Sequence, residues 1–584
     1  MKQKRTIFVI NAFFIFTFAG IFITYPLVFH LGDYATGLGD ELLIAWIHSW
    51  VIHILLSDPV SLFQANLYYP YHNTLAYSDL FLTSSLLSAL PTYLIGQPIA
   101  ANNISLIFSL ALLGFSLFLL AYYVTKDFLS SLLAGLLVIF SPAVLSYSVH
   151  LQMIEVFWVP LSLLFWILFL QKRKTKYLLA CLLCFLLQVY NSFLPGYFII
   201  FSLVILFIFK WFDNKKQTKK LFTRKHVFYV LLAVLLVVPI AIPYFAVSHE
   251  FKYVRDIRET IHFALQPEDL LYPGDTTRLK DVLLSIVPTN NYSQNNEFKP
   301  GYLGFVFSGL CIFTVFYLWK KRKKIKWHEK SFFTIGMTGI ILSLGPFLHL
   351  NRQTIHDPFP IPLPYLLFYY LMPGFQGFRN SARWEMLFIM TIAIVIALVI
   401  SKCIARYSLR KRIVILLLLF GGIVGEFNFP MHFVSVPQIQ QFPPVYSWIA
   451  TTPKEDIIVE LPIYNWNTTP YVSNEMLREY YSTMHFRRTV NGYSGFSPPP
   501  WQILVTDTLS NFPDRKTSAQ LQEIGITKII IHTDEYDMLA QDQFRLNNKK
   551  LPSGKEVIKK LQKEKSLVLT KKFEDTYVYK FNNR

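Results

Sequence analysis

An acidic pair at positions 40 and 41 is the first group in this sequence that could do chemistry. Asp40 and Glu41 follow Gly39 at the start of a predicted helix within residues 33–59. A positioned carboxylate can remove the proton of a hydroxyl group while that hydroxyl attacks another atom. Asp is also a favoured N-cap residue, so helix capping is the alternative for Asp40. The residues alone leave both roles open, and they leave open which carboxylate is the base.

A second polar group lies where one predicted membrane span ends and the next begins. It consists of His150, Gln152 and Glu155. Ionisable groups inside membrane-spanning stretches are rare and are often functional. The alternatives are a histidine with satisfied hydrogen bonds and a Glu155 carboxylate that is held by a structural partner.

Two arginines in the motif F-R-N-S-A-R-W-E form a third group. Arg379 and Arg383 are four residues apart, which predicts that they share one helical face. The planar guanidinium group matches the oxygens of a phosphate. Pairing with Glu385 or with a lipid headgroup is the alternative. A fourth, charged group is interpreted as a solvated helix: Lys252, Arg255, Asp256, Arg258 and Glu259.

The elements that position these residues are predicted to be mostly membrane-spanning helices. Of the 584 residues, 53% are hydrophobic and 16% are charged. Apolar runs recur that reach the roughly 20 residues needed to cross a bilayer. The net charge is +19, but residues 430–584 hold 19 Lys and Arg against 16 Asp and Glu. Most of the positive charge therefore lies in short loops between apolar runs, which marks the cytoplasmic side and does not indicate nucleic-acid binding.

The placement of these basic loops predicts about eleven spans, with the N-terminus inside and the C-terminal part outside the cell membrane. Residues 80–95 are predicted not to cross, because a crossing there would break the alternation of basic loops. The helix within residues 33–59 is predicted to lie on the outer membrane surface. The predicted spans are 7–29, 104–123, 129–148, 153–170, two within 177–210, 227–247, 302–319, 332–350, 384–401 and 413–427.

Two domains are predicted from the change in composition along the chain. Residues 1–429 form the membrane domain, with long outer loops at 30–100, 248–300 and 351–383. Residues 430–584 form a small α/β domain. Its predicted strands are D-I-I-V-E-L-P-I and T-K-I-I-I-H, its helix is K-E-V-I-K-K-L-Q-K, and a hairpin turns near Glu574 and Asp575.

Other chemistry has little support in the sequence. All four cysteines lie in or beside apolar runs, and the C-x-x-C of Cys181 and Cys184 lies inside a predicted span. The chain has no H-E-x-x-H, no G-x-S-x-G and no phosphate-binding G-x-x-x-x-G-K-[ST] motif. We therefore expect neither a metal nor another cofactor.

Several motifs give the chain a family resemblance. They are Y-P-L-V-F-H-L-G with G-D-E-L-L-I-A-W, F-R-N-S-A-R-W, V-E-L-P, and N-G-Y-S-G-F-S-P-P with L-Q-E-I-G-I-T-K-I-I-I-H. With an acidic first outer loop, many spans and an outer C-terminal domain, the chain resembles the C-type (multispanning, GT-C fold) glycosyltransferases, in a bacterial branch of that superfamily.

This resemblance implies transfer of a sugar from a polyprenyl-phosphate donor to a lipid, glycan or protein acceptor at the outer membrane face. By matching position, it implies Asp40 as the general base and Arg379 or Arg383 as ligands of the donor phosphate. It implies no required metal.

Two other functions remain as alternatives. A transporter or flippase for lipid-linked sugars would need broken helices in paired halves, and only one such break is found, near Asn191. A non-catalytic scaffold would use the aromatic and Pro-rich stretch N-G-Y-S-G-F-S-P-P-P-W to bind a carbohydrate or a partner protein.

Overall fold

The chain divides into two compact units. The computed structural model describes residues 2–219, 221–271, 277–286, 301–321, 325–350, 353–354, 360–427, 431–465, 471–547 and 550–582. Unit 1 comprises residues 1–30, 103–245 and 252–433, and unit 2 comprises residues 31–102, 246–251 and 434–584. The predicted boundary at residue 430 is not the same division, because the first long loop shares a unit with the C-terminal segment. Residues 1–429 as a membrane domain and 430–584 as an outer domain stay a prediction.

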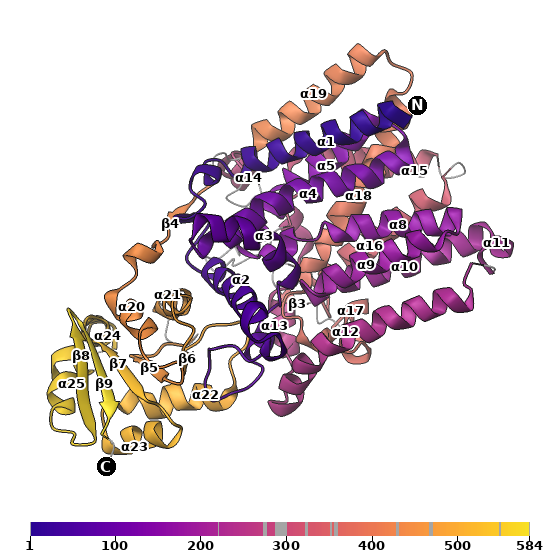
Figure 1. Ribbon diagram of the computed structural model, residues 1–584. Helices are drawn as coiled ribbons and strands as arrows, with labels where there is room; N and C mark the ends of the chain where they lie inside the picture. The colour runs from indigo at the N-terminus through magenta and orange to yellow at the C-terminus, as the bar shows by residue number, and fades with distance from the viewer. Residues whose placement is uncertain are drawn as a thin grey trace. The chain divides into compact units, whose positions relative to one another are not determined.

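Unit 1 consists mainly of long helices (Figure 1). Two of them, α4 and α12, have one end in unit 2. The long helices are α1 (Lys2–Ile23), α4 (Ile99–Thr125), α5 (Phe128–Ile139), α8 (Trp158–Lys172), α9 (Thr175–Val189), α10 (Phe193–Asp213), α12 (Arg224–Glu250), α15 (Phe305–Lys320), α16 (Trp327–Ser343), α18 (Glu385–Ile404) and α19 (Leu409–Glu426).

Shorter helices connect these long ones. They are α6 (Pro142–Leu145), η4 (Ser146–Val149), α7 (Leu151–Ile154), α11 (Lys215–Lys219), α13 (Ile257–His262), α14 (Lys280–Ile286), α17 (Pro364–Leu371), η7 (Phe375–Gly377) and η8 (Ser381–Trp384).

Helix α18 lies at the centre of unit 1. It packs against α5 and α16, and nearly all of its residues are buried. Its sequence is apolar on every side, as expected for a helix that is surrounded by others. Gly339 of α16 lets the two backbones approach closely, because a Cβ there would lie 2.8 Å from the Phe388 amide nitrogen.

The helical multispan membrane class is confirmed. Among the described residues, seven helices are long and apolar enough to cross a membrane, or eight if one bent pair counts as a span. One of these seven is α2 (Asp40–Ser57), which was predicted to lie on the membrane surface. Helices also form in the remaining predicted spans, but α9, α15, α16 and α19 are shorter or more polar than the seven, and α16 ends at Ser343. The count of about eleven crossings, the surface position of residues 33–59 and the orientation of the chain stay predictions.

One predicted span is broken. Residues 129–148 were expected to form one helix, but α5 ends at Ile139 and Pro142 begins α6, with a bend of 46° between the two segments. Proline lacks an amide hydrogen and its ring clashes with the preceding turn, so it starts a helix more easily than it continues one.

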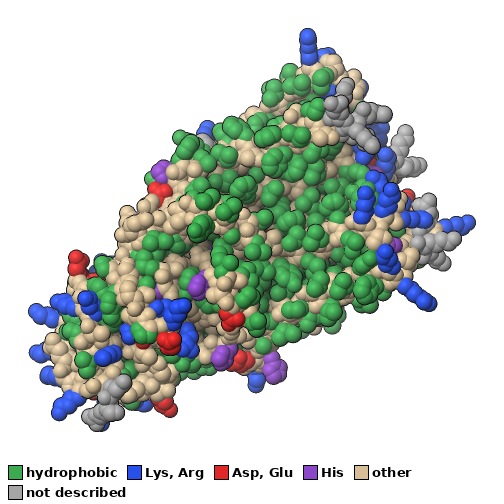
Figure 2. All heavy atoms as spheres, viewed as in Figure 1, with side chains coloured by type: hydrophobic (Ala, Val, Ile, Leu, Met, Phe, Trp, Pro, Cys, Tyr) green, Lys and Arg blue, Asp and Glu red, His purple; other side chains and the backbone are tan. Residues whose placement is uncertain are grey.

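The surface of unit 1 separates apolar from basic side chains. Figure 2 shows a broad hydrophobic face over its long helices, with Lys and Arg gathered at the end where α11 lies. Helix α12 contributes many exposed apolar residues to this surface, among them Phe228, Leu231 and Leu235. Such a face is suited to lipid, and the basic end matches the loops that were predicted to lie inside.

Unit 2 contains α2 (Asp40–Ser57) and α3 (Leu82–Ile95), which pack against each other. The predicted helix within residues 33–59 is therefore confirmed. The apolar residues that recur along it at helical spacing are buried except for the half-buried Leu55; they are Leu43, Trp46, Ile47, Trp50, Val51, Ile54 and Leu55. The first turns of α2 are buried on their other sides as well, at Leu42, Ile44 and Ala45.

The C-terminal segment of unit 2 forms a mixed five-stranded sheet in the order β6-β5-β7-β9-β8. Strands β5 (Ile457–Leu461) and β7 (Lys528–His532) pair in parallel, as do β5 and β6 (Arg488–Thr489). Strands β8 (Leu567–Phe573) and β9 (Thr576–Phe581) form the predicted hairpin. The helices around the sheet are α20 (Pro444–Ala450), α21 (Val472–Ser482), α22 (Pro499–Ile503), α23 (Arg515–Glu523), α24 (Thr533–Asn547) and α25 (Gly554–Leu561).

The first long loop is hydrogen-bonded to this C-terminal segment. Strand β1 (Tyr34–Ala35) pairs with β4 (Val434–Ser435). At the edge strand β6, the Thr489 amide donates to the Asn66 carbonyl at 2.7 Å, and the Tyr69 amide donates to the Thr489 carbonyl at 2.8 Å. The loop that carries Asp40 is therefore fixed by the sheet region.

Candidate functional site

Asp40 does not cap its helix. The N-cap residue of α2 is Gly39, and Asp40 is the first helical residue. The Tyr493 hydroxyl donates a hydrogen bond to Asp40 Oδ1 at 3.1 Å. Asp40 is half-buried, so its carboxylate is not sealed from solvent. The geometry therefore leaves Asp40 suited to act on a bound hydroxyl group.

Glu41 has a structural role in this arrangement. Its side chain turns back onto the preceding loop, where Oε1 accepts from the Thr36 hydroxyl at 2.7 Å and Oε2 accepts from the Gly39 amide at 3.2 Å. It is 2% exposed, and a Cβ on Gly37 would lie 2.9 Å from Glu41 Oε1. The two adjacent carboxylates therefore differ: Glu41 fixes the loop, and Asp40 is the better candidate base.

Tyr493 and Glu479 were not identified from the sequence as residues of this site. Glu479 Oε2 accepts a hydrogen bond from the Tyr493 amide at 3.1 Å. Burial first, and then the charges of Glu475 and Asp40, raise the pKa of Glu479 well above its ordinary value. Burial and the charge of Asp40 likewise raise the pKa of Tyr493, so its hydroxyl stays protonated. The motif N-G-Y-S-G-F was the available signal, but nothing in it indicated contact with Asp40.

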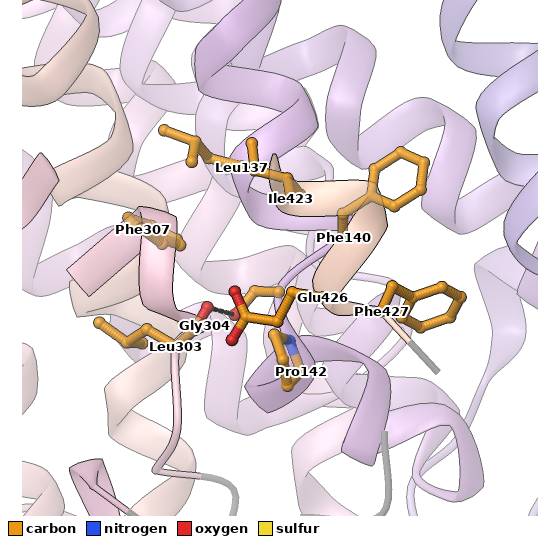
Figure 3. Close-up of a pocket in the computed structure, with 10 residues that line it drawn as sticks. Leu137, Phe140, Pro142, Leu303, Gly304, Phe307, Ile423, Glu426 and Phe427 are labelled. Atoms are coloured by element: carbon orange, nitrogen blue, oxygen red, sulfur yellow. Dashed lines mark hydrogen bonds between the residues drawn. The ribbon is translucent and has the colours of Figure 1, made fainter. Parts of the chain in front are cut away.

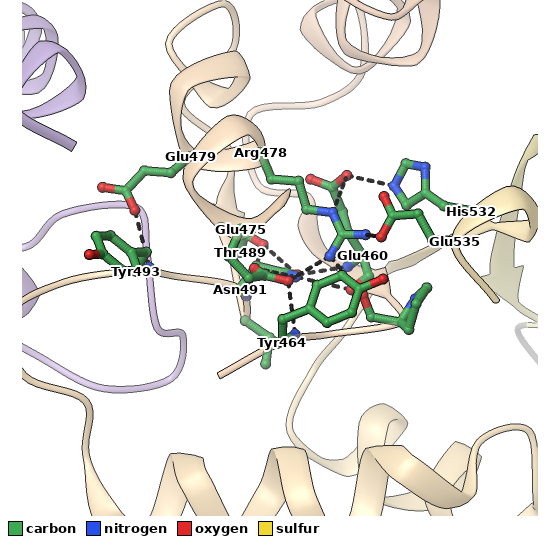
Figure 4. A network of polar contacts seen from close by, with 12 residues as sticks. Glu460, Tyr464, Glu475, Arg478, Glu479, Thr489, Asn491, Tyr493, His532 and Glu535 are labelled. Atoms are coloured by element: carbon green, nitrogen blue, oxygen red, sulfur yellow. Dashed lines mark hydrogen bonds and ion pairs between the residues drawn. The ribbon is translucent and has the colours of Figure 1, made fainter. Parts of the chain in front are cut away.

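A separate buried polar network lies beside this pair and reaches into the sheet (Figure 4). At its centre, Arg478 donates to Glu475 Oε1 at 2.5 Å and to Glu535 Oε2 at 2.7 Å. Its Nε lies 3.9 Å from Glu460 Oε2, which in turn lies 2.9 Å from His532 Nε2. Burial raises the pKa of Glu475 to about 7, even though Arg478 opposes this shift.

The arginines of the third group are not arranged as predicted. Arg379 lies in an extended segment before η8, whereas Arg383 lies within η8, so the two do not share a helical face. The extended conformation of Asn380 separates them, with φ −109° and ψ 99°. Arg379 Nε lies 3.8 Å from Glu259 Oε1, and its guanidinium group lies 4.8 Å from the Phe263 ring centre.

Two residues of the fourth, charged group, Arg255 and Glu259, lie near Arg379 in unit 1. Arg255 also pairs with Glu259, at 3.4 Å, and the two side chains are 18% and 30% exposed. Asp256 and Arg258 pair with each other on the surface, as the interpretation of a solvated helix predicted. Arg255 and Glu259 are only partly exposed, and the Glu259 carboxylate lies near both Arg255 and Arg379, so these residues are less solvated than was predicted.

The second polar group is split between two surroundings. His150 is 5% exposed and lies close enough to Arg383 and Arg379 to feel their positive charges. Gln152 is also buried. Glu155 accepts a hydrogen bond from Asn191 at the break between α9 and α10, so a structural partner holds its carboxylate. His150 therefore lies near Arg379 and Arg383. The burial of the Glu155 carboxylate is explained by its bond to Asn191 and does not require a bound ligand.

Glu385 does not serve as the hydrogen-bond partner of the two arginines. It is 1% exposed, and neither carboxylate oxygen has a hydrogen-bond partner among the residues that the structure describes. Tyr147 lies near Glu385 and Arg383 and is equally buried. The alternative in which Glu385 holds Arg379 or Arg383 by hydrogen bonds is therefore not observed.

A pocket elsewhere in unit 1 has a structural explanation (Figure 3). It is lined by Leu137, Phe140, Ser141, Pro142, Leu303, Gly304, Phe307, Ile423, Glu426 and Phe427. The Glu426 carboxylate accepts from the Phe305 amide at 2.7 Å, at the start of α15, and from the Tyr302 hydroxyl. A carboxylate at a helix N-terminus is stabilised by the exposed amides and the helix dipole. Glu426 therefore fixes α15 to the end of α19.

We expect Glu426→Ala to destabilise unit 1. It would leave the Phe305 amide and the Tyr302 hydroxyl without their acceptor, at a cost of about 2 to 3 kcal/mol in the free energy of unfolding. Thermal unfolding of the detergent-solubilised protein measures this effect. Glu455→Ala, at an exposed residue, is the control and should change little. Equal unfolding temperatures for the two variants would contradict the role of Glu426.

Among the described residues, no group of three or more His, Cys, Asp or Glu side chains is arranged to hold a metal ion. The residues that the structure does bring together are carboxylates, hydroxyls and guanidinium groups.

Comparison with solved structures gave similarities that extend over most or all of the chain. The arabinofuranosyltransferase AftD from Mycobacteria matches with a TM-score of 0.49 and 12% identity, covering 100% of this chain and 40% of that one. The oligosaccharyltransferase AglB from Archaeoglobus fulgidus, solved with an inhibitory peptide and a dolichol-phosphate, matches with a TM-score of 0.46 and 12% identity, covering 91% and 70%.

A third similar structure is ArnT from Cupriavidus metallidurans bound to undecaprenyl phosphate. Its TM-score is 0.38 at 10% identity, covering 99% of this chain and 98% of that one. The predicted resemblance is accompanied by a structural similarity to these three proteins that covers 91 to 100% of the chain, and at 10 to 12% identity it concerns the fold alone. The chain spans 40% of the length of AftD.

Comparison with curated proteins gave no match. One family model matches residues 52–423, and its description is a domain of unknown function, DUF6311. This match covers more than half of the chain, so the chain belongs to the DUF6311 family.

Proposed function

We propose that this protein is a membrane glycosyltransferase that uses a polyprenyl-phosphate sugar as donor at the outer face of the membrane. The observation that carries the proposal is the setting of Asp40. Its half-buried carboxylate is not used as a helix cap, it is held by the Tyr493 hydroxyl, and its neighbour Glu41 is occupied elsewhere. The class of donor comes from the sequence resemblance.

In the proposed reaction, a hydroxyl oxygen of the acceptor forms a bond to the anomeric carbon of the donor sugar. The bond between that carbon and the phosphate oxygen breaks, and the polyprenyl phosphate leaves with the electron pair. Asp40 takes the proton of the attacking hydroxyl as general base. The acceptor is a lipid, a glycan or a protein.

The leaving phosphate gains negative charge, and Arg379 and Arg383 are proposed to bind it. Guanidinium groups placed near a developing charge stabilise it in the transition state. The nearness of both arginine charges to the buried His150 supports this role.

The experiment that tests the proposed function is a donor screen. Membranes that contain the protein are incubated with a panel of polyprenyl-phosphate sugars, and products are identified by mass spectrometry. Membranes with the Asp40→Asn variant provide the matched control. We expect a glycosylated product from at least one donor with the wild type only. Identical products from wild-type and variant membranes would contradict the proposal.

Lysine at position 379 or 383 should weaken donor binding. Lysine keeps the charge but loses the planar fork, so we expect the Kd for the donor to rise about tenfold, equivalent to about 1.4 kcal/mol. Donor binding to the purified variants measures this change.

The control for both arginine variants is Arg258→Lys, whose side chain is exposed and pairs with Asp256. Its donor affinity should equal that of the wild type. If Arg379→Lys and Arg383→Lys both bind donor as well as this control does, the arginines have only a structural role.

A further inference from the structure

The loop at residues 491–493 is fixed from two sides of unit 2. The Asn491 side chain accepts from the Glu460 amide at 2.7 Å and donates to Glu475 Oε2 at 3.0 Å, which ties it to the sheet network. Gly492 lies against the Tyr68 ring, where a Cβ would come within 2.7 Å of a ring carbon. These contacts of Asn491 and Gly492 therefore fix the backbone that leads into Tyr493.

Tyr493 links this loop to the candidate base. Its side chain is 4% exposed, and its hydroxyl donates to Asp40 Oδ1 at 3.1 Å. A hydrogen bond donated to a carboxylate favours the ionised form, which is the form that can accept a proton. It also limits the directions in which the carboxylate can point.

Glu479 holds the backbone of Tyr493 from the other side (Figure 4). Its Oε2 accepts from the Tyr493 amide at 3.1 Å, and the side chain is 2% exposed. Its other oxygen, Oε1, has no hydrogen-bond partner among the described residues. A carboxyl group this deeply buried, with no cation paired to it in the described part of the chain, is stable in its neutral form. Glu479 can therefore position Tyr493 without adding a second negative charge beside Asp40.

We propose that Tyr493 is a positioning residue for Asp40, held in place by Glu479 and Asn491, so that the C-terminal sheet region completes the catalytic base. This inference rests on the proposed function. It gives the motif N-G-Y-S-G-F a role within the transferase, in place of binding a separate partner.

The first test is the pH profile of kcat/KM for sugar transfer by Tyr493→Phe. Loss of a hydrogen bond worth about 1 to 1.5 kcal/mol should raise the pKa of the base by about one unit. The acid limb of the profile should then move up by about one pH unit, with the KM for the donor unchanged. Tyr77→Phe is the matched control, since the buried Tyr77 hydroxyl has no hydrogen-bond partner among the described residues. Its acid limb should stay at the wild-type position.

The second test compares two substitutions of Glu479 and does not depend on the folding of Tyr493→Phe. Glu479→Gln keeps an oxygen for the Tyr493 amide and is neutral, so as the conservative variant it should lose much less turnover than Glu479→Ala. Glu479→Ala removes that acceptor, and we expect turnover to fall about tenfold, as for the loss of about one hydrogen bond. Equal activity of these two variants would overturn the positioning role of Glu479.

The outcomes separate this inference from the proposed function. An inactive Asp40→Asn protein together with a shifted acid limb in Tyr493→Phe supports both. An inactive Asp40→Asn protein with an unshifted limb in Tyr493→Phe overturns the positioning role and leaves the proposed function standing. A fully active Asp40→Asn protein overturns the two together.

Discussion

Replacing Asp40 by Asn is expected to lower the turnover of sugar transfer by about a hundredfold or more. Asparagine has nearly the same size and still offers an oxygen to the Tyr493 hydroxyl, but it cannot take a proton. The fold should survive, because the N-cap of α2 is Gly39 and no side-chain cap is lost. Turnover of the purified variant is measured at saturating donor, and thermal unfolding is measured in the same preparation.

Glu41→Gln is the matched comparison for this variant. Gln offers one acceptor oxygen where Glu41 uses two, towards Thr36 and Gly39. We expect a loss of about 1 kcal/mol in stability with most of the turnover retained. Full turnover in a stable Asp40→Asn protein would rule out Asp40 as the base. Loss of turnover in Glu41→Gln alone would move the base by one residue.

Replacing Arg478 by Met is expected to have the largest effect on stability. Arg478 is 4% exposed in its side chain and is paired with Glu475, Glu460 and Glu535. Methionine would fill a similar volume but would leave these carboxylates without their cation. Breaking a buried ion pair from one side costs about 3 to 5 kcal/mol. Thermal unfolding of the full-length protein should show a lower transition temperature for the region that contains the sheet.

Arg488→Met provides the control for this prediction. Arg488 is exposed on the edge strand β6, and its guanidinium group lies 5.3 Å from the Tyr69 ring centre. A substitution at such a surface site should change the free energy of unfolding by about 0.5 kcal/mol or less. If the two variants unfolded at the same temperature, the network around Arg478 would not contribute to stability as its contacts indicate.

The local structure was largely predictable from the sequence. Short apolar runs identified the strands around Val459 and Ile530. Gly525 follows the end of α23, where its φ of +88° favours glycine. Long apolar runs identified the membrane helices. These features depend on neighbours in sequence, which a single chain displays directly.

The contacts of the candidate site could not be predicted in the same way. Asp40 and Tyr493 are separated by 453 positions, and no local pattern indicates which distant hydroxyl reaches a carboxylate. The spacing of Arg379 and Arg383 suggested a shared helical face, but Asn380 is extended and the helix begins after it. The role of Glu41 depended on a loop that folds back onto it, from Thr36 to Gly39.

The most direct test of the proposed function measures both products of one reaction. Purified wild-type protein is mixed with a polyprenyl-phosphate donor that carries a labelled sugar, and the glycosylated acceptor and the free polyprenyl phosphate are counted over time. We predict equal amounts of the two for the wild type and about a hundredfold less of both for Asp40→Asn. Release of polyprenyl phosphate at the same rate by wild type and Asp40→Asn would contradict a reaction in which Asp40 is the base.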